Sequence, residues 1–113
     1  MQIEAKKYLY DVRQATRRLT EFTAGKDFND YQQDPMLRAA VERQFEIIGE
    51  ALGQLAKLDR TIAARISEHS RIIAFRNILI HGYADIDDQL VWDIVQTKVP
   101  LLSCEVEALL KED

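Results

Sequence analysis

Apolar residues recur every three or four positions along most of this chain of 113 residues, and this spacing constrains its fold more than any other feature. It matches the turn of an amphipathic α-helix, whereas no stretch shows the strict alternation of apolar and polar residues typical of a strand. The spacing predicts a first helix from Ile3 to Phe22 and a second from Pro35 to Lys57. Residues 24–34 carry Gly, Asn and Asp without periodicity and are expected to form a loop.

Local signals place the ends of the next helices. Asp34 before Pro35 is typical of an N-cap residue followed by the first helical position. Residues 58–70 are expected to form a connection with one or two helical turns, which leads into a third helix from about Glu68 to His81. Gly82 follows and is expected to end this helix in the left-handed conformation, which glycine adopts without a steric penalty.

The last part of the chain is predicted to be a helix interrupted by a proline. Asp85, Asp87 and Asp88 suit a helix start, because carboxylates cap free N–H groups and face the positive end of the helix dipole. Pro100 lacks an N–H and is expected to kink or briefly break this helix. The chain is therefore expected to be a single all-α domain over residues 1–113, an up-and-down bundle of four main helices with a possible short fifth.

The second predicted helix carries two features that call for close neighbours. Its apolar positions form a near-heptad seam, which favours a partner helix and gives dimerisation a physical route. Gly49 and Gly53 lie four residues apart inside it, where each glycine costs about 1 kcal/mol relative to alanine. A close approach of a neighbouring segment is expected to compensate for this cost.

Charge and composition argue against several classes of protein. The net charge of −4 disfavours binding of nucleic acid over the whole surface, because such binding depends on contacts from Lys and Arg to phosphate. No run approaches the roughly 18 apolar residues of a membrane span, and no signal-peptide core is present, so a cytoplasmic protein is expected. Cys104 is the only cysteine, which excludes an internal disulfide, and its apolar neighbours predict a buried position.

Two further sets of polar residues favour structural interpretations. Arg13, Arg17 and Arg18 lie on the polar side of the first helix, where a solvated face is favoured over a surface that contacts RNA. His69 and His81 are twelve residues apart and no paired carboxylate stands at ligand spacing, so no dedicated metal site is expected.

The segment RNILIHGY, residues 76–83, places polar residues within an aliphatic run. At 100° per residue, Asn77 and His81 lie one turn apart on the same helical face, and Arg76 and Tyr83 would nearly eclipse if the helix continued. Burial of these groups without partners is costly, so the polar strip is expected at an edge of the core or between subunits. Ordinary capping and ion pairing is one interpretation of the strip, and catalysis is the other.

The chemistry that suits this strip is metal-independent cleavage of a phosphodiester bond. His81 can take the proton of a ribose 2′-hydroxyl or give one to the leaving oxygen. Arg76 can hold the phosphate through two parallel hydrogen bonds as charge develops. One histidine cannot easily do both tasks, whereas a two-fold dimer would bring two histidines and two arginines to one cleft.

The motif FRNILIHGY, together with ERQFEIIGEA at residues 42–51 and VWDIV and VPLL within residues 91–102, resembles the HEPN superfamily and, within it, the HepT-like toxins. The resemblance covers most of the chain. Its signature is Arg, four residues, His, one residue and Tyr, which Arg76, His81 and Tyr83 match. Asn77 is the usual residue after the arginine of this signature.

The resemblance implies an RNA-cleaving toxin that acts as a homodimer with a composite site and needs no cofactor. It also implies a cognate nucleotidyltransferase antitoxin, which transfers AMP from ATP to the tyrosine of the motif and so blocks the nuclease. By this resemblance Arg76 and His81 are catalytic, Asn77 supports them and Tyr83 is adenylylated. The superfamily uses both transfer RNA and messenger RNA, so the resemblance does not select the substrate.

Two alternatives stay open at this point. If the second and third helices pack together, Glu46 or Glu50 can orient Arg76 or His81; otherwise both form ordinary surface pairs, as with Arg43. The function itself has an alternative from another class, a non-catalytic dimeric helical module that binds the nucleotidyltransferase as a partner or substrate carrier.

Overall fold

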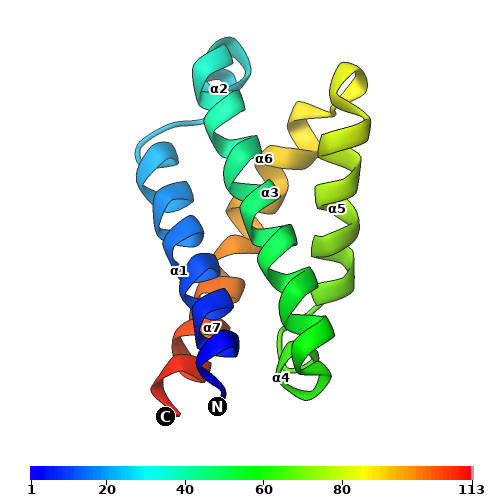
Figure 1. Ribbon diagram of the computed structural model, residues 1–113. Coiled ribbons are helices and arrows are strands. Elements are labelled where there is room, and N and C mark those ends of the chain that lie inside the picture. The colour runs from blue at the N-terminus through cyan, green and yellow to red at the C-terminus, as the bar shows by residue number, and fades with distance from the viewer. Residues whose placement is uncertain (113) are drawn as a thin grey trace.

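A computed structural model describes residues 1–112, apart from the side chain of Tyr83. Within this range the chain is helical and contains no strand, which confirms the predicted all-α class (Figure 1). The elements are α1 (Ile3–Thr23), α2 (Phe28–Gln33), α3 (Pro35–Leu58), α4 (Arg60–Ala64), α5 (His69–His81), the 3-10 turn η1 (Tyr83–Asp85), α6 (Asp88–Thr97) and α7 (Val99–Lys111).

The described residues thus form seven α-helices, more than the four or five that the sequence predicted. The short α4 lies in the expected connection, and the break near Pro100 divides the last helix into α6 and α7, as its missing N–H predicts. The third helix was predicted to within one residue of α5. The additional short helix, α2, lies where a loop was expected.

The loop prediction for residues 24–34 was wrong because a local capping arrangement forms a helix there. Asp27 accepts a hydrogen bond from the Asp30 N–H at 2.8 Å, and Asp30 accepts one from the Asp27 N–H at 3.0 Å. This reciprocal pair satisfies two N–H groups that a helix start leaves free. Tyr31, one residue later, is fully buried and its ring lies 5.3 Å from that of Trp92 on α6. Six residues are too few for apolar periodicity to reveal such a helix.

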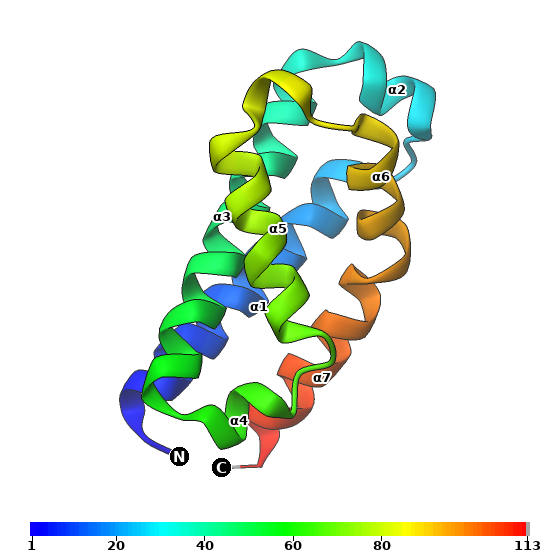
Figure 2. The same ribbon diagram turned by 90° about the vertical axis from the view of Figure 1, so that its right-hand side faces the viewer.

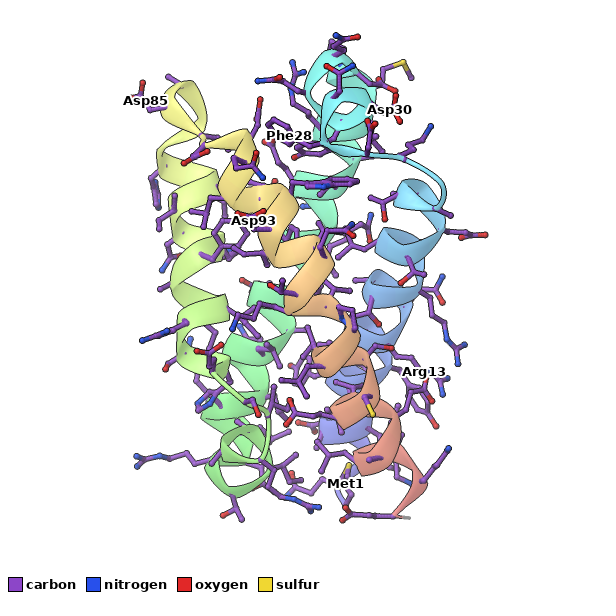
Figure 3. All side chains as sticks on the ribbon, turned by 180° about the vertical axis from the view of Figure 1, so that it is seen from behind. Met1, Arg13, Phe28, Asp30, Asp85 and Asp93 are labelled. Carbon is purple, nitrogen blue, oxygen red and sulfur yellow. The ribbon has the colours of Figure 1, made fainter. Side chains whose placement is uncertain are left out.

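Two predicted N-caps are confirmed. Asp34 accepts hydrogen bonds from the N–H groups of Met36 and Leu37, both at 3.1 Å, with Pro35 at the first position of α3. Asp87 caps α6 in the same way. Figure 3 shows Asp85, in the turn before α6, at the same end of the molecule as Phe28 and Asp30 of α2.

Gly82 ends α5 as predicted, but the predicted left-handed conformation is wrong. Its φ is −111° and its ψ is 27°. The Gly82 N–H donates to the carbonyl oxygen of Ile78 at 2.8 Å, and a Cβ on Gly82 would lie 2.9 Å from that same oxygen. Glycine is therefore required here by a close approach and not by a positive φ.

The core is formed by the apolar sides of the longer helices. Helix α1 packs along α3 and α7, and α3 also packs along α5, so α3 lies between α1 and α5 (Figure 1). Both termini lie at the end opposite α2 and η1 (Figure 2). The fully buried residues of α1, α3, α6 and α7 include Leu9, Val12, Leu19, Val41, Ile48, Leu52, Leu55, Val91 and Val106. No helix of the described chain is both long and apolar enough to cross a bilayer.

Cys104 is exposed, so the predicted burial was wrong. Leu102, Val106 and Leu109 provide the buried side of α7. Cys104 stands two residues from Leu102, which places it about 200° around the helix, on the opposite side. The apolar neighbours of Cys104 in the sequence therefore do not share its environment.

Candidate functional site

Arg76 lies where α5 crosses α3. Its Nη2 atom is 3.1 Å from Oε2 of Glu50 on α3, and its Nη1 atom donates to Oδ1 of Asn77 at 3.2 Å. Its Nε atom is buried without a hydrogen-bond partner in the described structure. The guanidinium is therefore held by a charged and a polar group from two helices, and this charge-assisted contact is stronger than a neutral hydrogen bond.

Helix α3 can approach Arg76 closely because residue 49 is glycine. A Cβ on Gly49 would lie 2.2 Å from the Cβ of Arg76, so the expected close approach exists at this position. At Gly53, one turn further along α3, nothing lies within 4 Å of an added Cβ, so the same expectation was wrong there. The two glycines look alike in sequence, and only the position of α5 distinguishes them.

His81 is the last residue of α5, and its side chain is exposed. Asn77, also exposed, precedes it by four residues and therefore lies one turn away on the same side of α5. The structure thus brings Arg76 and Asn77 into direct contact and places His81 next along the exposed surface of the helix.

The two glutamates of α3 take different positions. Glu50 pairs with Arg76 and also accepts a hydrogen bond from Gln54 at 3.3 Å. Glu46 instead pairs with Arg43 at 3.7 Å, the intrahelical arrangement of an ordinary surface pair. The two open interpretations therefore divide between the residues, because Glu50 can orient Arg76 whereas Glu46 makes the local pair.

Arg76 and both glutamates border a groove of about 210 Å³ between α1, α3 and α5. The groove is lined by Tyr8, Asp11, Arg43, Glu46, Ile47, Glu50, Ala51, Gln54, Arg76 and Ile80. Its two arginines face three carboxylates, so it is not a broad cationic track. A phosphate that enters must approach Arg76 from the side that Glu50 leaves open.

Two of the three arginines of α1 are engaged with α7. Arg17 donates to Oε1 of Glu107 at 3.0 Å, and Arg13 lies 3.9 Å from the other oxygen of this carboxylate. The Arg13 guanidinium also stacks on the ring of Tyr10, 4.7 Å from its centre. These contacts favour the structural interpretation of Arg13 and Arg17 over an RNA-facing one.

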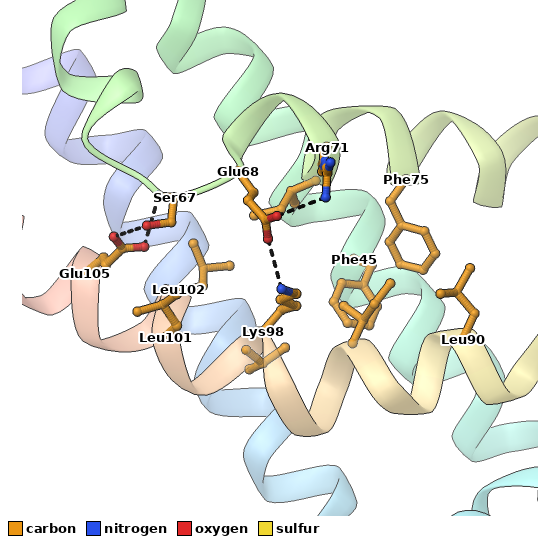
Figure 4. Close-up of a pocket in the computed structure, with 13 residues that line it drawn as sticks. Phe45, Ser67, Glu68, Arg71, Phe75, Leu90, Lys98, Leu101, Leu102 and Glu105 are labelled. Carbon is orange, nitrogen blue, oxygen red and sulfur yellow. Dashed lines mark hydrogen bonds and ion pairs between the residues drawn. The ribbon is translucent and has the colours of Figure 1, made fainter.

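An apolar groove of about 250 Å³ separates α5 from α6 and α7, and periodicity gave no sign of it (Figure 4). Glu68 bridges its middle, 3.0 Å from Nζ of Lys98 and 3.1 Å from Arg71. Lys98, the nearer cation, holds the pKa of the Glu68 carboxyl below its usual range. Glu105 accepts two hydrogen bonds from Ser67 at one end of the groove. Beyond these polar contacts, α5 leaves this side open and packs chiefly against α3.

A partly buried polar cluster lies apart from both grooves, where α2, α3 and α6 meet. Burial raises the pKa of the Tyr31 hydroxyl, which has no hydrogen-bond partner among the described atoms. Burial and then the nearby Asp88 carboxylate raise the pKa of Glu42, while Arg38 acts in the opposite direction. We assign the charge effects of this cluster to stability.

The remaining candidate residue is Tyr83. Its backbone begins η1 directly after Gly82, whereas its side chain lies outside the described part of the structure. Its modification therefore stays a prediction. Among the described residues, no three His, Cys, Asp or Glu side chains gather as a metal-ligand set.

Comparison with known proteins finds relatives along nearly the whole chain. A family model described as "Ribonuclease HepT-like" matches residues 12–109. A protein of Methanocaldococcus jannaschii named "Putative RNase" is 38% identical over 104 residues, 92% of this chain and 94% of the relative. A protein of Caldanaerobacter subterraneus with the same description is 31% identical over 106 residues, 94% of each chain. The "Probable ribonuclease HepT" of Thermococcus cleftensis is 32% identical over 106 residues, 94% of this chain and 96% of the relative. No solved structure matches the chain at a significant level.

Proposed function

Because this chain belongs to the HepT-like ribonuclease family, we propose that it is a metal-independent RNA endonuclease and the toxin of a toxin–antitoxin pair. One observation carries this proposal: α5 holds the Arg76 guanidinium against Glu50 and Asn77, and it presents His81 at its exposed end. Helix α5 thus carries both a cation that can hold a phosphate and an exposed imidazole that can transfer a proton, the two groups that metal-independent phosphodiester cleavage uses.

The proposed reaction uses the ribose of the RNA as its own nucleophile. The 2′-oxygen attacks the neighbouring phosphorus and the bond from phosphorus to the 5′-oxygen breaks. One imidazole accepts the proton of the 2′-hydroxyl, and a second protonated imidazole donates its proton to the leaving 5′-oxygen. Arg76 neutralises the charge that develops on the phosphate oxygens, and Asn77 and Glu50 hold its guanidinium in place.

Two imidazoles require two copies of the chain, since His81 is the one histidine of the motif. We propose a two-fold homodimer in which both α5 helices border one cleft. Support comes from apolar residues on the open side of the molecule. Ile78 on α5 is 55% exposed, and Leu90 and Leu101, which border the groove of Figure 4, are 46% and 48% exposed. A second copy that covers them would remove apolar surface from water.

The proposed neutralisation acts on Tyr83. A cognate nucleotidyltransferase transfers AMP from ATP to the phenolic oxygen of Tyr83, with release of pyrophosphate. The added nucleotide brings bulk and negative charge within two residues of His81, where the RNA phosphate must bind. Modification and substrate binding therefore exclude each other.

The central experiment measures cleavage of RNA by the purified protein in the presence of a chelator. We expect cleavage by the wild type and its loss in His81→Ala. The matched control is His69→Ala, which removes the histidine at the opposite end of α5 and retains cleavage. Equal activity of His81→Ala and the wild type would refute the assignment of the nuclease site.

One observation favours a second candidate function, a non-catalytic dimeric module that binds the nucleotidyltransferase. Asp11, Glu46 and Glu50 in the groove beside Arg76 repel a phosphate backbone. This alternative predicts tight association with the nucleotidyltransferase, no RNA cleavage at any protein concentration and no growth arrest on expression. Substitution of His81 would then change neither the association with the nucleotidyltransferase nor growth on expression.

A further inference from the structure

Gly49 is the buried residue of α3 over which Arg76 passes. A Cβ on Gly49 would lie 2.2 Å from the Cβ of Arg76, 2.6 Å from its Cγ and 3.4 Å from its Cδ. Cβ atoms in proteins essentially never come within 3.0 Å of a non-bonded heavy atom outside their own residue and its chain neighbours. The two nearest atoms belong to the stem of Arg76, close to its backbone, so a rotation of the outer side chain cannot relieve the contact. Arg76 therefore lies against the backbone of α3 only because residue 49 has no side chain.

The helices have little freedom to move apart at this point. Phe45 on α3, one turn before Gly49, meets Phe75 on α5 edge to face, with ring centres 5.3 Å apart. Both rings are buried, and such a contact stabilises one spacing of the two helices. The stem of Arg76 is thus confined between its own helix and α3.

This confinement determines where the charged end of Arg76 lies. With its stem against α3, the Nη2 atom reaches Glu50, the residue next to Gly49, and the Nη1 atom reaches Asn77. The Nε atom becomes buried without a partner, a cost that a looser side chain would avoid by turning to solvent. The close approach at Gly49 therefore holds the guanidinium in one orientation.

We propose that Gly49 is a positioning residue for the catalytic arginine: the absence of its side chain sets the distance and direction at which α5 presents Arg76 to the RNA phosphate. This inference rests on the proposed function, in which Arg76 contacts that phosphate. A methyl group at position 49 displaces the stem of Arg76 from α3 and separates its guanidinium from Glu50. A displacement of about 1 Å at a catalytic group lowers rates by about 10²-fold.

Gly53 provides a matched control on the same helix. It lies one turn from Gly49, and nothing approaches an added Cβ within 4 Å. Both Gly49→Ala and Gly53→Ala remove a helix-weakening glycine from α3, so their effects on helix propensity are equal. A difference between the two variants therefore reports the contact with Arg76.

The first measurement is the rate of RNA cleavage by the full-length protein. We expect Gly49→Ala to lower kcat by about 10²-fold, with less change in KM, because the arginine is displaced and not removed. Gly53→Ala is expected to cleave like the wild type. Equal activity of Gly49→Ala and Gly53→Ala would overturn the proposal.

The second measurement does not depend on catalysis. The Nε–H of Arg76 gives its own signal in proton–nitrogen NMR spectra, and burial slows its exchange with water. We expect faster exchange of this hydrogen in Gly49→Ala and unchanged exchange in Gly53→Ala. If the wild type cleaves no RNA, the proposed function fails, while this signal still decides whether Gly49 positions Arg76. Unchanged exchange in Gly49→Ala would disprove that role.

A stability comparison covers the case in which Gly49→Ala is poorly folded. Arg76→Gly removes the Cβ and Cγ atoms that the new methyl group would contact. We expect Gly49→Ala to lower Tm in the wild-type background and not to lower it in the Arg76→Gly background. The same loss of Tm in both backgrounds would show that the contact with Arg76 is not the cause and would overturn the proposal.

Discussion

Glu50 on α3 and Arg76 on α5 form an ion pair across the helix interface, with 3.1 Å between Oε2 and Nη2. The two residues lie 26 positions apart in the chain. The carboxylate is more exposed than the guanidinium, so its contribution to stability is small, about 0–1 kcal/mol for a pair of this kind. The ion pair therefore affects mainly the orientation of the Arg76 guanidinium.

We expect Glu50→Ala to lower the kcat of RNA cleavage roughly 10- to 100-fold without a rise in KM, because the Arg76 guanidinium loses one of the two side chains that orient it. The free energy of unfolding should change by less than about 1 kcal/mol. The control is Glu107→Ala, which removes a carboxylate that pairs with Arg13 and Arg17 between α7 and α1 and should leave cleavage unchanged. If Glu46→Ala loses more activity than Glu50→Ala, then Glu46 and not Glu50 positions Arg76, and the assignment is wrong.

The proposed dimer makes a prediction for Leu101, which borders the apolar groove between α5, α6 and α7. We expect Leu101→Lys to weaken self-association at least tenfold, since a lysine charge would have to be desolvated in the interface. Light scattering should show a shift from dimer to monomer, and RNA cleavage should fall with it. Met36→Lys changes an exposed apolar residue at the start of α3, outside this groove, and should stay dimeric. If the Leu101→Lys protein remains a dimer, the interface does not lie at this groove.

The proposed adenylylation predicts the behaviour of Tyr83→Phe. After incubation with the cognate nucleotidyltransferase and ATP, intact-mass spectrometry should show AMP on the wild type and none on this variant. Tyr10→Phe, which removes the hydroxyl of an exposed tyrosine on α1, should accept AMP like the wild type. If the phenol serves only as acceptor, Tyr83→Phe stays toxic and escapes neutralisation. An AMP adduct on the Tyr83→Phe protein would disprove the assignment.

The raised pKa of the Glu42 carboxyl leads to a prediction of how the stability of the fold depends on pH. Burial first, and the Asp88 carboxylate second, raise its pKa from 4.5, against the effect of Arg38; Glu46 raises it further. A carboxyl whose pKa rises on folding binds its proton more tightly in the folded state. Its stabilising contribution is therefore complete below pH 4.5 and is lost as the pH rises through the folded-state pKa.

Replacement of Glu42 by glutamine removes this loss, so we expect Glu42→Gln to raise Tm at pH 7 and the difference to shrink toward pH 4. Thermal unfolding followed by circular dichroism between pH 4 and pH 8 measures the effect. The exposed Glu21→Gln serves as the control and should follow the wild-type profile. A Glu42→Gln protein with lower Tm than the wild type at pH 7 would contradict the assignment.

Periodicity predicted the long helices because it samples a repeating property over many residues. The start of α3 followed from Asp34 and Pro35, and the end of α5 followed from Gly82, because the effects of these residues are local. Helix α2 was missed since its six residues depend on one reciprocal hydrogen-bond pair and on the burial of Tyr31. Cys104 was misplaced because sequence neighbours on a helix point in different directions.

The sequence by itself determined the all-α class, the family and the motif residues Arg76, Asn77, His81 and Tyr83, because these depend on residue type and on spacing along one helix. It did not distinguish Glu50 from Glu46, nor Gly49 from Gly53. Each of these pairs is one helical turn apart on α3, so the two members have equivalent local positions. Only the packing of α5 on α3 decided that Glu50 and Gly49 contact Arg76, since the register between two helices depends on side chains far apart in the chain.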